Sequence, residues 1–187
     1  MEYFEAEYIL DGTSFVTDMT LAVEQGEITG LVPADEIPDG ADVEQLGRVA
    51  VVPGLVNAHS HAFQRMIRGR TEFIEPGRED DDFWAWRERM YRAALTLDPE
   101  QLECVARLAF LEMALTGITS VGEFHYLHHQ PDGMAYADPN ELAKRVISAA
   151  RSVGLRINLL RVGYTRAGFE TEANPRQRRF VEFDVDT

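Results

Sequence analysis

The sequence has one cysteine, one lysine and no long apolar stretch. Cys104 has no partner within the chain, so a scaffold held together by internal disulfides is excluded. No run approaches the ~20 apolar residues that a membrane-spanning helix needs, and no membrane partner is expected. Residues 1–10 contain three glutamates and no basic residue, which is unlike a secretory or mitochondrial signal. We therefore expect a cytoplasmic protein.

Positive charge is also scarce. The chain has 18 basic and 32 acidic side chains, giving a formal net charge of −14, and residues 1–48 hold twelve of the acidic ones against the single base Arg48. Binding to nucleic acid requires clustered Lys and Arg, so nucleic acid is not an expected partner. The 45% of hydrophobic and 10% of aromatic residues indicate a folded globular protein.

The pattern along the chain changes near residue 49. Residues 1–48 alternate short apolar stretches with turn signals, which predicts a small β-rich domain that resembles a β-sandwich. Residues 49–187 form the second predicted domain, in which strands and helices alternate as in an α/β fold with a parallel sheet. The predicted strands are 49–56 with a bend at Pro53 and Gly54, then 118–124 and 155–162; the predicted helices are 83–95, 99–116 and 139–153.

Three parallel strands are too few to close a barrel. The (β/α)8 TIM barrel needs eight strands and typically ~250 residues, so we expect residues 49–187 to be the first βα units of such a barrel and the chain to be truncated. The last strand would then present an open edge. We expect residues 1–187 on their own to be inactive, and either to aggregate, to bind a partner through that edge, or to fold only within a longer chain.

Two histidines follow the first strand of the second domain. His59 and His61 are at positions i and i+2 of an extended segment, so their imidazoles point to the same side and can converge on one metal ion, with Zn–N distances of ~2.0–2.1 Å. A His-x-His pair alone is more often solvated or hydrogen-bonded than metal-binding. Here an apolar strand and a Pro-Gly bend precede it, in a chain of βα order, and this context favours a metal site.

Four strings of residues carry a family resemblance. Residues 53–61, PGLVNAHSH, resemble the first-strand signature of the amidohydrolase superfamily. HAFQR at 61–65, FWAWRE at 83–88 and EFHYLHH at 123–129 resemble the formimidoylglutamate deiminase family within it. The resemblance implies a metal-dependent TIM-barrel hydrolase with a small N-terminal domain. Members of that family act in histidine degradation, converting N-formimino-L-glutamate and water into N-formyl-L-glutamate and ammonia.

The resemblance also implies roles for individual residues. His59 and His61 would be two ligands of a single zinc ion, and Gln64, Arg87 and Tyr126 would contact the substrate. The remaining metal ligands and the catalytic acid/base residues are expected beyond residue 187, and the full-length protein is expected to be a homodimer.

The residues themselves leave alternatives open. An arginine guanidinium can bind a carboxylate through two parallel hydrogen bonds, and formiminoglutamate carries two carboxylates. Arg87 could equally be an exposed residue on an ordinary helix face. The Gln64 side chain could either donate a hydrogen bond to a substrate carboxylate or cap a helix. Tyr126 could either offer its hydroxyl to the substrate or only bury its ring. We expect His125, His128 and His129 to be structural or solvated, and Cys104 to be a small buried residue of its helix.

Two other functions compete with this interpretation. A different amidohydrolase deaminase, acting on a heterocycle such as guanine, cytosine or a triazine, would share the opening motif but would not need Arg87 for an anionic substrate. A non-catalytic fragment that acts as a binding module is the second alternative.

Overall fold

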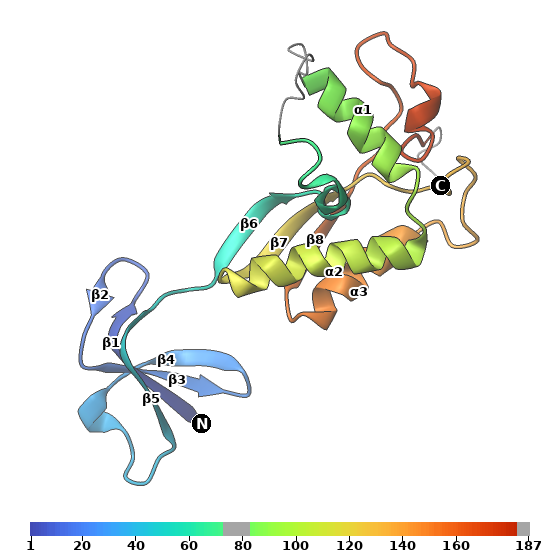
Figure 1. Cartoon of the computed structure of the whole chain (residues 1–187). Coiled ribbons are helices and arrows are strands. Elements are labelled where there is room, and N and C mark those ends of the chain that lie inside the picture. The colour runs from blue at the N-terminus through green and yellow to red at the C-terminus, as the bar shows by residue number, and fades with distance from the viewer. Residues whose placement is uncertain (73–82, 183–187) are drawn as a thin grey trace. The chain divides into compact units, whose positions relative to one another are not determined.

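The computed structural model describes residues 1–72 and 83–182. The chain divides into two compact units, Met1–Pro53 and Gly54–Thr187 (Figure 1). The boundary lies after Pro53, so residues 49–53, which were predicted to open the second domain, belong to the first.

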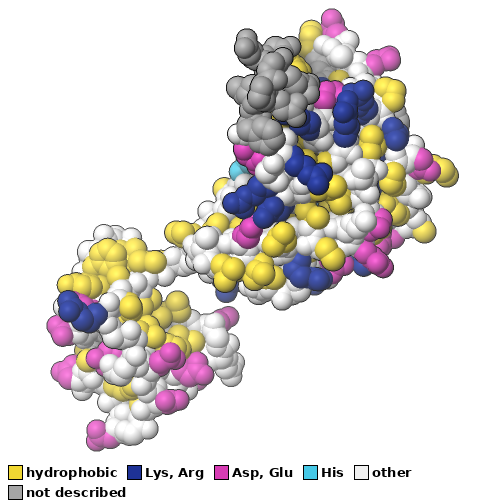
Figure 2. All heavy atoms as spheres, in the orientation of Figure 1, with side chains coloured by type: hydrophobic (Ala, Val, Ile, Leu, Met, Phe, Trp, Pro, Cys, Tyr) yellow, Lys and Arg dark blue, Asp and Glu magenta, His cyan; other side chains and the backbone are white. Residues whose placement is uncertain are grey.

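The first unit is built on one five-stranded sheet. Strand β1 pairs antiparallel with β3, antiparallel with β2 near its C-terminal end, and parallel with β5, while β4 extends the sheet beyond β3. The unit is rich in β-strands, and they form one sheet where the sequence predicted a sandwich-like segment. Figure 2 shows acidic side chains spread over the face of this unit that is in view. The strands are β1 Glu2–Leu10, β2 Phe15–Val16, β3 Met19–Glu24, β4 Glu27–Pro33 and β5 Val43–Val51.

The predicted strand over residues 49–56 is wrong, because two strands of different sheets share this apolar run. Ala50 and Val51 end β5 and pair with Tyr8 and Ile9 of β1. Pro53 lacks the N–H that would continue a ladder. A Cβ on Gly54 would lie 2.2 Å from the Thr119 side chain, so only glycine fits where the next strand begins.

The second unit contains a three-stranded parallel sheet in the order β6-β7-β8. Strands and helices alternate along the chain, which confirms the predicted α/β pattern. Helices α2 and α3 pack against each other, α2 contacts β7 and α3 contacts β8, so both helices lie along the sheet (Figure 1). The elements are β6 Leu55–Ser60, β7 Ile118–His125, β8 Arg156–Arg161, α1 Phe83–Ala94, α2 Pro99–Leu115 and α3 Glu141–Ser152, with short 3-10 helices η2 Ala62–Ile67 and η3 Pro175–Gln177.

Helix α2 begins where its capping residues predict. The Asp98 carboxylate accepts a hydrogen bond from the Gln101 N–H at 2.7 Å, and the Gln101 side chain accepts one from the Asp98 N–H at 3.2 Å. The helix buries Leu102 and Ala106 on the face that packs against the core. Cys104 is exposed, which corrects the prediction that it is buried, because position 104 lies about 200° around the helix from Leu102.

Helix α3 starts later than predicted. Asp138 does not cap it; its carboxylate accepts a hydrogen bond from the Asn140 N–H at 2.9 Å and pairs with Lys144. The helix therefore begins at Glu141, with Asn140 as its N-cap residue. In the part of the chain that the structure describes, no helix combines the length and apolar character needed to cross a bilayer.

Candidate active site

The two predicted metal ligands lie together at the C-terminal end of β6. His59 is near the end of the strand, and His61 follows it as the residue that opens η2. Their ring centroids are 4.8 Å apart with an interplanar angle of 84°. The alternation of an extended segment thus places both imidazoles on one side, as the spacing predicted.

A backbone contact sets the tautomer of His61. Its Nδ1 lies 3.0 Å from the carbonyl oxygen of Phe124 in β7. A carbonyl only accepts, so Nδ1 carries the proton and Nε2 is left with its lone pair, as in a metal-binding imidazole whose other nitrogen is held by a carbonyl. Burial lowers the pKa of His61, and the nearby His59 acts in the same direction. The neutral ring that a metal requires is therefore favoured at neutral pH.

These two histidines fit a divalent metal but would not complete its coordination. Zinc takes four ligands in most protein sites. Among residues 1–72 and 83–182, no group of three or more His, Cys, Asp or Glu side chains is arranged to hold a metal ion. A metal at His59 and His61 would take its other ligands from elsewhere.

Glu123 is a site residue that the sequence analysis did not single out. Its side chain is 1% exposed, its Oε1 accepts the Ala62 N–H at 2.7 Å, and it also hydrogen-bonds Ser60. It therefore joins β7 to the turn that carries His61. Burial raises the pKa of this carboxyl to about 7. In the sequence, the indication of this role was that Glu123 is the single acidic residue within the strand Ile118–His125.

Gln64 and Tyr126, two of the predicted substrate residues, contact each other. Gln64 Nε2 donates to the Tyr126 hydroxyl at 2.8 Å, so Gln64 acts as a side-chain donor and not as a helix cap. The Tyr126 ring centroid lies 5.2 Å from that of His61. Burial raises the pKa of Tyr126, which keeps its hydroxyl neutral. Residues from β6, η2 and the end of β7 thus meet at one place.

Aromatic side chains lie between Arg87 and Tyr126. Its Nε donates to the Tyr91 hydroxyl at 2.6 Å, and its guanidinium carbon lies 5.0 Å from the ring centroid of Trp84. Tyr91 packs on Phe180 with ring centroids 5.6 Å apart, and Phe180 packs on Tyr126 at 5.2 Å. The Arg87 side chain is therefore fixed by Tyr91 and Trp84, whereas the alternative was an exposed arginine on a helix face. Two ring contacts, through Phe180, separate Tyr91 from Tyr126.

His125, the last residue of β7, and His128 are buried, and His129 is partly buried, which agrees with the expectation that these three histidines are structural or solvated. His128 donates from Nε2 to the Val162 carbonyl at 2.9 Å, and His129 donates from Nε2 to the Val181 carbonyl at 2.8 Å. Burial lowers the pKa of His125 to about 3. These bonds join the loop after β7 to the segments that follow β8.

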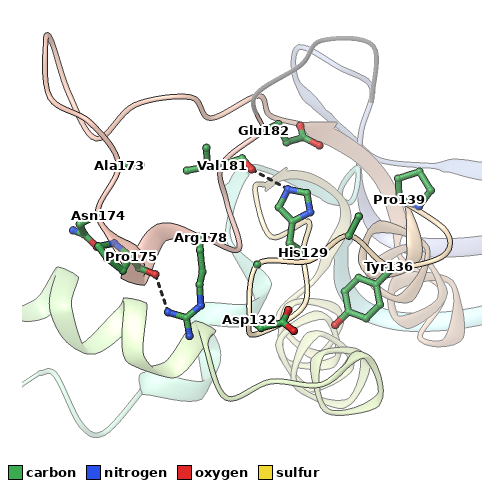
Figure 3. A pocket seen from close by; sticks show the side chains of 12 residues that line it. His129, Asp132, Tyr136, Pro139, Ala173, Asn174, Pro175, Arg178, Val181 and Glu182 are labelled. Atoms are coloured by element: carbon green, nitrogen blue, oxygen red, sulfur yellow. Dashed lines mark hydrogen bonds between the residues drawn. The ribbon is translucent and has the colours of Figure 1, made fainter.

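A cavity of about 740 Å³ lies next to His129 and does not include the predicted site residues. It is lined by the loop after β7 and by residues 173–182 (Figure 3). The His129 ring is bonded to the Val181 carbonyl, and Arg178 Nη1 donates to the Pro175 carbonyl at 2.8 Å. The cavity is therefore distinct from the site at His59 and His61.

Comparisons with known proteins give a matching family and several relatives. The amidohydrolase family profile matches residues 50–185. Formimidoylglutamate deiminase of Pseudomonas aeruginosa is 42% identical over 177 residues, which are 94% of this chain and 38% of that protein. The 8-oxoguanine deaminase of the same organism is 32% identical over 119 residues, covering 63% of this chain and 25% of that protein. The chain thus spans about two fifths or less of these relatives.

Solved structures share the fold. An amidohydrolase from Brucella melitensis superposes with a TM-score of 0.86 at 38% identity, covering 97% of this chain and 40% of that one. Atrazine chlorohydrolase TrzN from Arthrobacter aurescens, complexed with zinc, superposes with a TM-score of 0.68 at 22% identity, covering 100% of this chain and 40% of that one. The second likeness shows the fold alone.

Proposed function

Because the chain belongs to the amidohydrolase family, we propose that it forms part of a metal-dependent hydrolase that converts N-formimino-L-glutamate and water into N-formyl-L-glutamate and ammonia. In this proposal β6, β7 and β8 are the first three strands of a (β/α)8 barrel, and histidine degradation supplies the substrate. The observation that carries it is the cluster at the strand ends, where the His59–His61 pair adjoins the bonded pair of Gln64 and Tyr126.

His59 and His61 would hold one zinc ion. A zinc ion bound there would make a hydroxide available at neutral pH by lowering the pKa of its water. Phe124 holds His61 in the tautomer that this role needs, and Glu123 fixes the turn behind it through the Ala62 N–H. The catalytic acid that protonates the leaving nitrogen is expected beyond residue 187.

Gln64, Arg87 and Tyr126 would bind the substrate. Formiminoglutamate carries two carboxylates, and a protein with net charge −14 must hold them with local donors. Arg87 uses Nε for Tyr91, so its two terminal nitrogens, which form the fork that suits a carboxylate, lie outside that bond. Gln64 and Tyr126 add neutral donors beside His61.

The similarity to 8-oxoguanine deaminase supports a second candidate, a deaminase of a heterocycle. The two functions differ in whether carboxylate donors are needed. Ammonia release should therefore be measured on formiminoglutamate and on 8-oxoguanine, using the protein as its gene encodes it, first depleted of metal and then restored with zinc. We expect release from formiminoglutamate only after zinc is restored. Release from 8-oxoguanine alone, or none from either substrate with zinc bound, would refute the proposal.

The location and assembly of the protein are further parts of this proposal. We place the full-length enzyme in the cytoplasm as a homodimer, on the strength of the family resemblance. Residues 1–187 produced alone should lack deiminase activity, because the proposed catalytic acid and remaining ligands are not among them. Deiminase activity from a monodisperse, cooperatively unfolding preparation of residues 1–187 would contradict this.

A further inference from the structure

The short helix η2 decides where two residues of the site lie. It covers Ala62–Ile67, begins directly after His61 and carries Gln64. A 3-10 helix has poorer hydrogen-bond geometry than an α-helix and occurs in short pieces, so its direction depends on contacts with its surroundings. The direction of η2 therefore sets the position of the Gln64 amide relative to the His61 ring.

Three hydrogen bonds tie this turn to β7 and to the residue that follows its end. Their pairs are His61–Phe124, Ala62–Glu123 and Gln64–Tyr126. The last pair joins two residues that are both assigned to the substrate, so a substrate bound by either of them would compete with that bond. Contacts that do not involve the substrate must then hold η2 in place.

Arg65 supplies such a contact, because it ties η2 to helix α2. Its Nε donates to Glu112 Oε2 at 2.7 Å, and its Nη2 donates to Glu112 Oε1 at 2.8 Å. In this two-point geometry a guanidinium matches a carboxylate, and the pair fixes a direction as well as a distance. The two side chains are 26% and 39% exposed. Exposed ion pairs usually contribute little, and two-point arginine–carboxylate geometry is the arrangement that departs from this rule.

Arg68 contacts the same carboxylate more loosely. Its Nη1 lies 3.3 Å and 3.4 Å from the two Glu112 oxygens, and its side chain is 63% exposed. One nitrogen shared between two oxygens at these distances does not define a direction. Arg68 is also the residue just after η2, so it provides a matched control with the same residue type and the same acceptor.

Glu112 lies on a helix that is itself fixed. The capping box at its N-terminus and a buried face with Leu102 and Phe110 hold α2 against the core. A hollow of about 360 Å³ is lined by His61 and by both members of the Arg65–Glu112 pair, together with other residues of β6, η2 and α2. The pair therefore lies beside the turn that carries the metal-binding histidine.

We propose that Arg65 and Glu112 are positioning residues of this site. Their two-point bond fixes η2 against α2, and η2 in turn places the His61 ring for a metal ion and the Gln64 amide for the substrate. The part that concerns Gln64 rests on the proposed function. The part that concerns His61 needs only a metal ion at the histidine pair.

Zinc affinity, measured by competition with a chromophoric chelator on the protein as its gene encodes it, tests the role toward His61. Arg65→Ala and Glu112→Ala should each lower zinc affinity about ten-fold, as when the support of a metal ligand is removed. The double variant should lose little more, because both changes break the same bond. Arg65→Lys keeps the charge without the two-point geometry, so it should not restore the affinity.

Two control variants and a spectroscopic measurement separate positioning from folding. Arg68→Ala should leave zinc affinity unchanged, and so should Arg107→Ala, which breaks the 2.8 Å ion pair with Glu103 on the same helix. The visible absorption of the Co²⁺-loaded protein should change in Glu112→Ala and not in the controls. Wild-type zinc affinity in Glu112→Ala, or an equal loss in Arg107→Ala, would overturn the inference. If Arg65→Ala fails to fold, Glu112→Ala and Arg65→Lys decide the matter.

Steady-state kinetics at saturating zinc test the role toward Gln64. The KM for formiminoglutamate should rise in Glu112→Ala by up to about ten-fold, which corresponds to the loss of one hydrogen bond to a charged group, and should stay unchanged in Arg68→Ala. An unchanged KM in Glu112→Ala would overturn the placement of Gln64. A wild-type protein that binds zinc but releases no ammonia from formiminoglutamate would instead refute the proposed function, and the zinc affinities would still decide the role toward His61.

Discussion

Replacing Glu123 with glutamine should remove a pH dependence of stability that this carboxyl creates. The side chain is 1% exposed and accepts the Ala62 N–H through Oε1, while its buried Oε2 has no hydrogen-bond partner among the described residues. Burial without a cationic partner disfavours the ionised form, and it raises the pKa in the folded protein to about 7 from the ordinary 4.5.

The sign and size of the effect follow from linkage. Below about pH 4.5 the carboxyl is protonated in both the folded and unfolded states, and it imposes no penalty. As the pH rises to about 7, the unfolded chain releases its proton while the folded chain keeps it, so the free energy of unfolding falls. The difference of 7 − 4.5 = 2.5 pKa units corresponds to a loss of about 3 kcal/mol, which is complete above pH 7.

Urea denaturation of metal-depleted wild-type protein and Glu123→Gln, at about pH 5 and pH 8, measures this. Both proteins carry the same histidines, so their titration cancels in the difference between the two. We expect wild type to lose roughly 2–3 kcal/mol more than the variant between these pH values. Parallel curves for the two proteins would show that Glu123 does not titrate in this range, and the argument from its burial would be wrong.

Two further predictions concern Arg87 and the cap of α2. Arg87→Ala should lower kcat/KM for formiminoglutamate about ten-fold to a hundred-fold with zinc content unchanged, a loss of about 1.5–3 kcal/mol of transition-state stabilisation, as for loss of a hydrogen bond to a charged group. An equal loss on N-butylformamidine, an amidine that has neither carboxylate, would show a structural role instead. Asp98→Ala should lower the free energy of unfolding by about 1 kcal/mol, because it removes the acceptor for the Gln101 N–H, whereas Asp98→Asn should recover most of that loss in the same urea titrations. Equal stability of Asp98→Ala and wild type would contradict the capping role.

Local sequence determined most of the second unit. Asp98, Pro99 and Gly117 bracket α2 because capping and glycine conformations act within a few residues, and the helix was predicted to within one residue of its observed end. The position of His59 and His61 on one side of an extended chain follows from the same short-range geometry.

Only the tertiary structure decided which sheet each strand joins and which polar groups meet. The apolar residues before and after Pro53 have the same pattern, and their separation depends on partners as distant as Ile9 and Thr119. Glu123 became part of the site because folding buries it and its carboxylate accepts the Ala62 N–H. Burial and long-range hydrogen bonding depend on residues far apart in the chain, so local pattern could not reveal them.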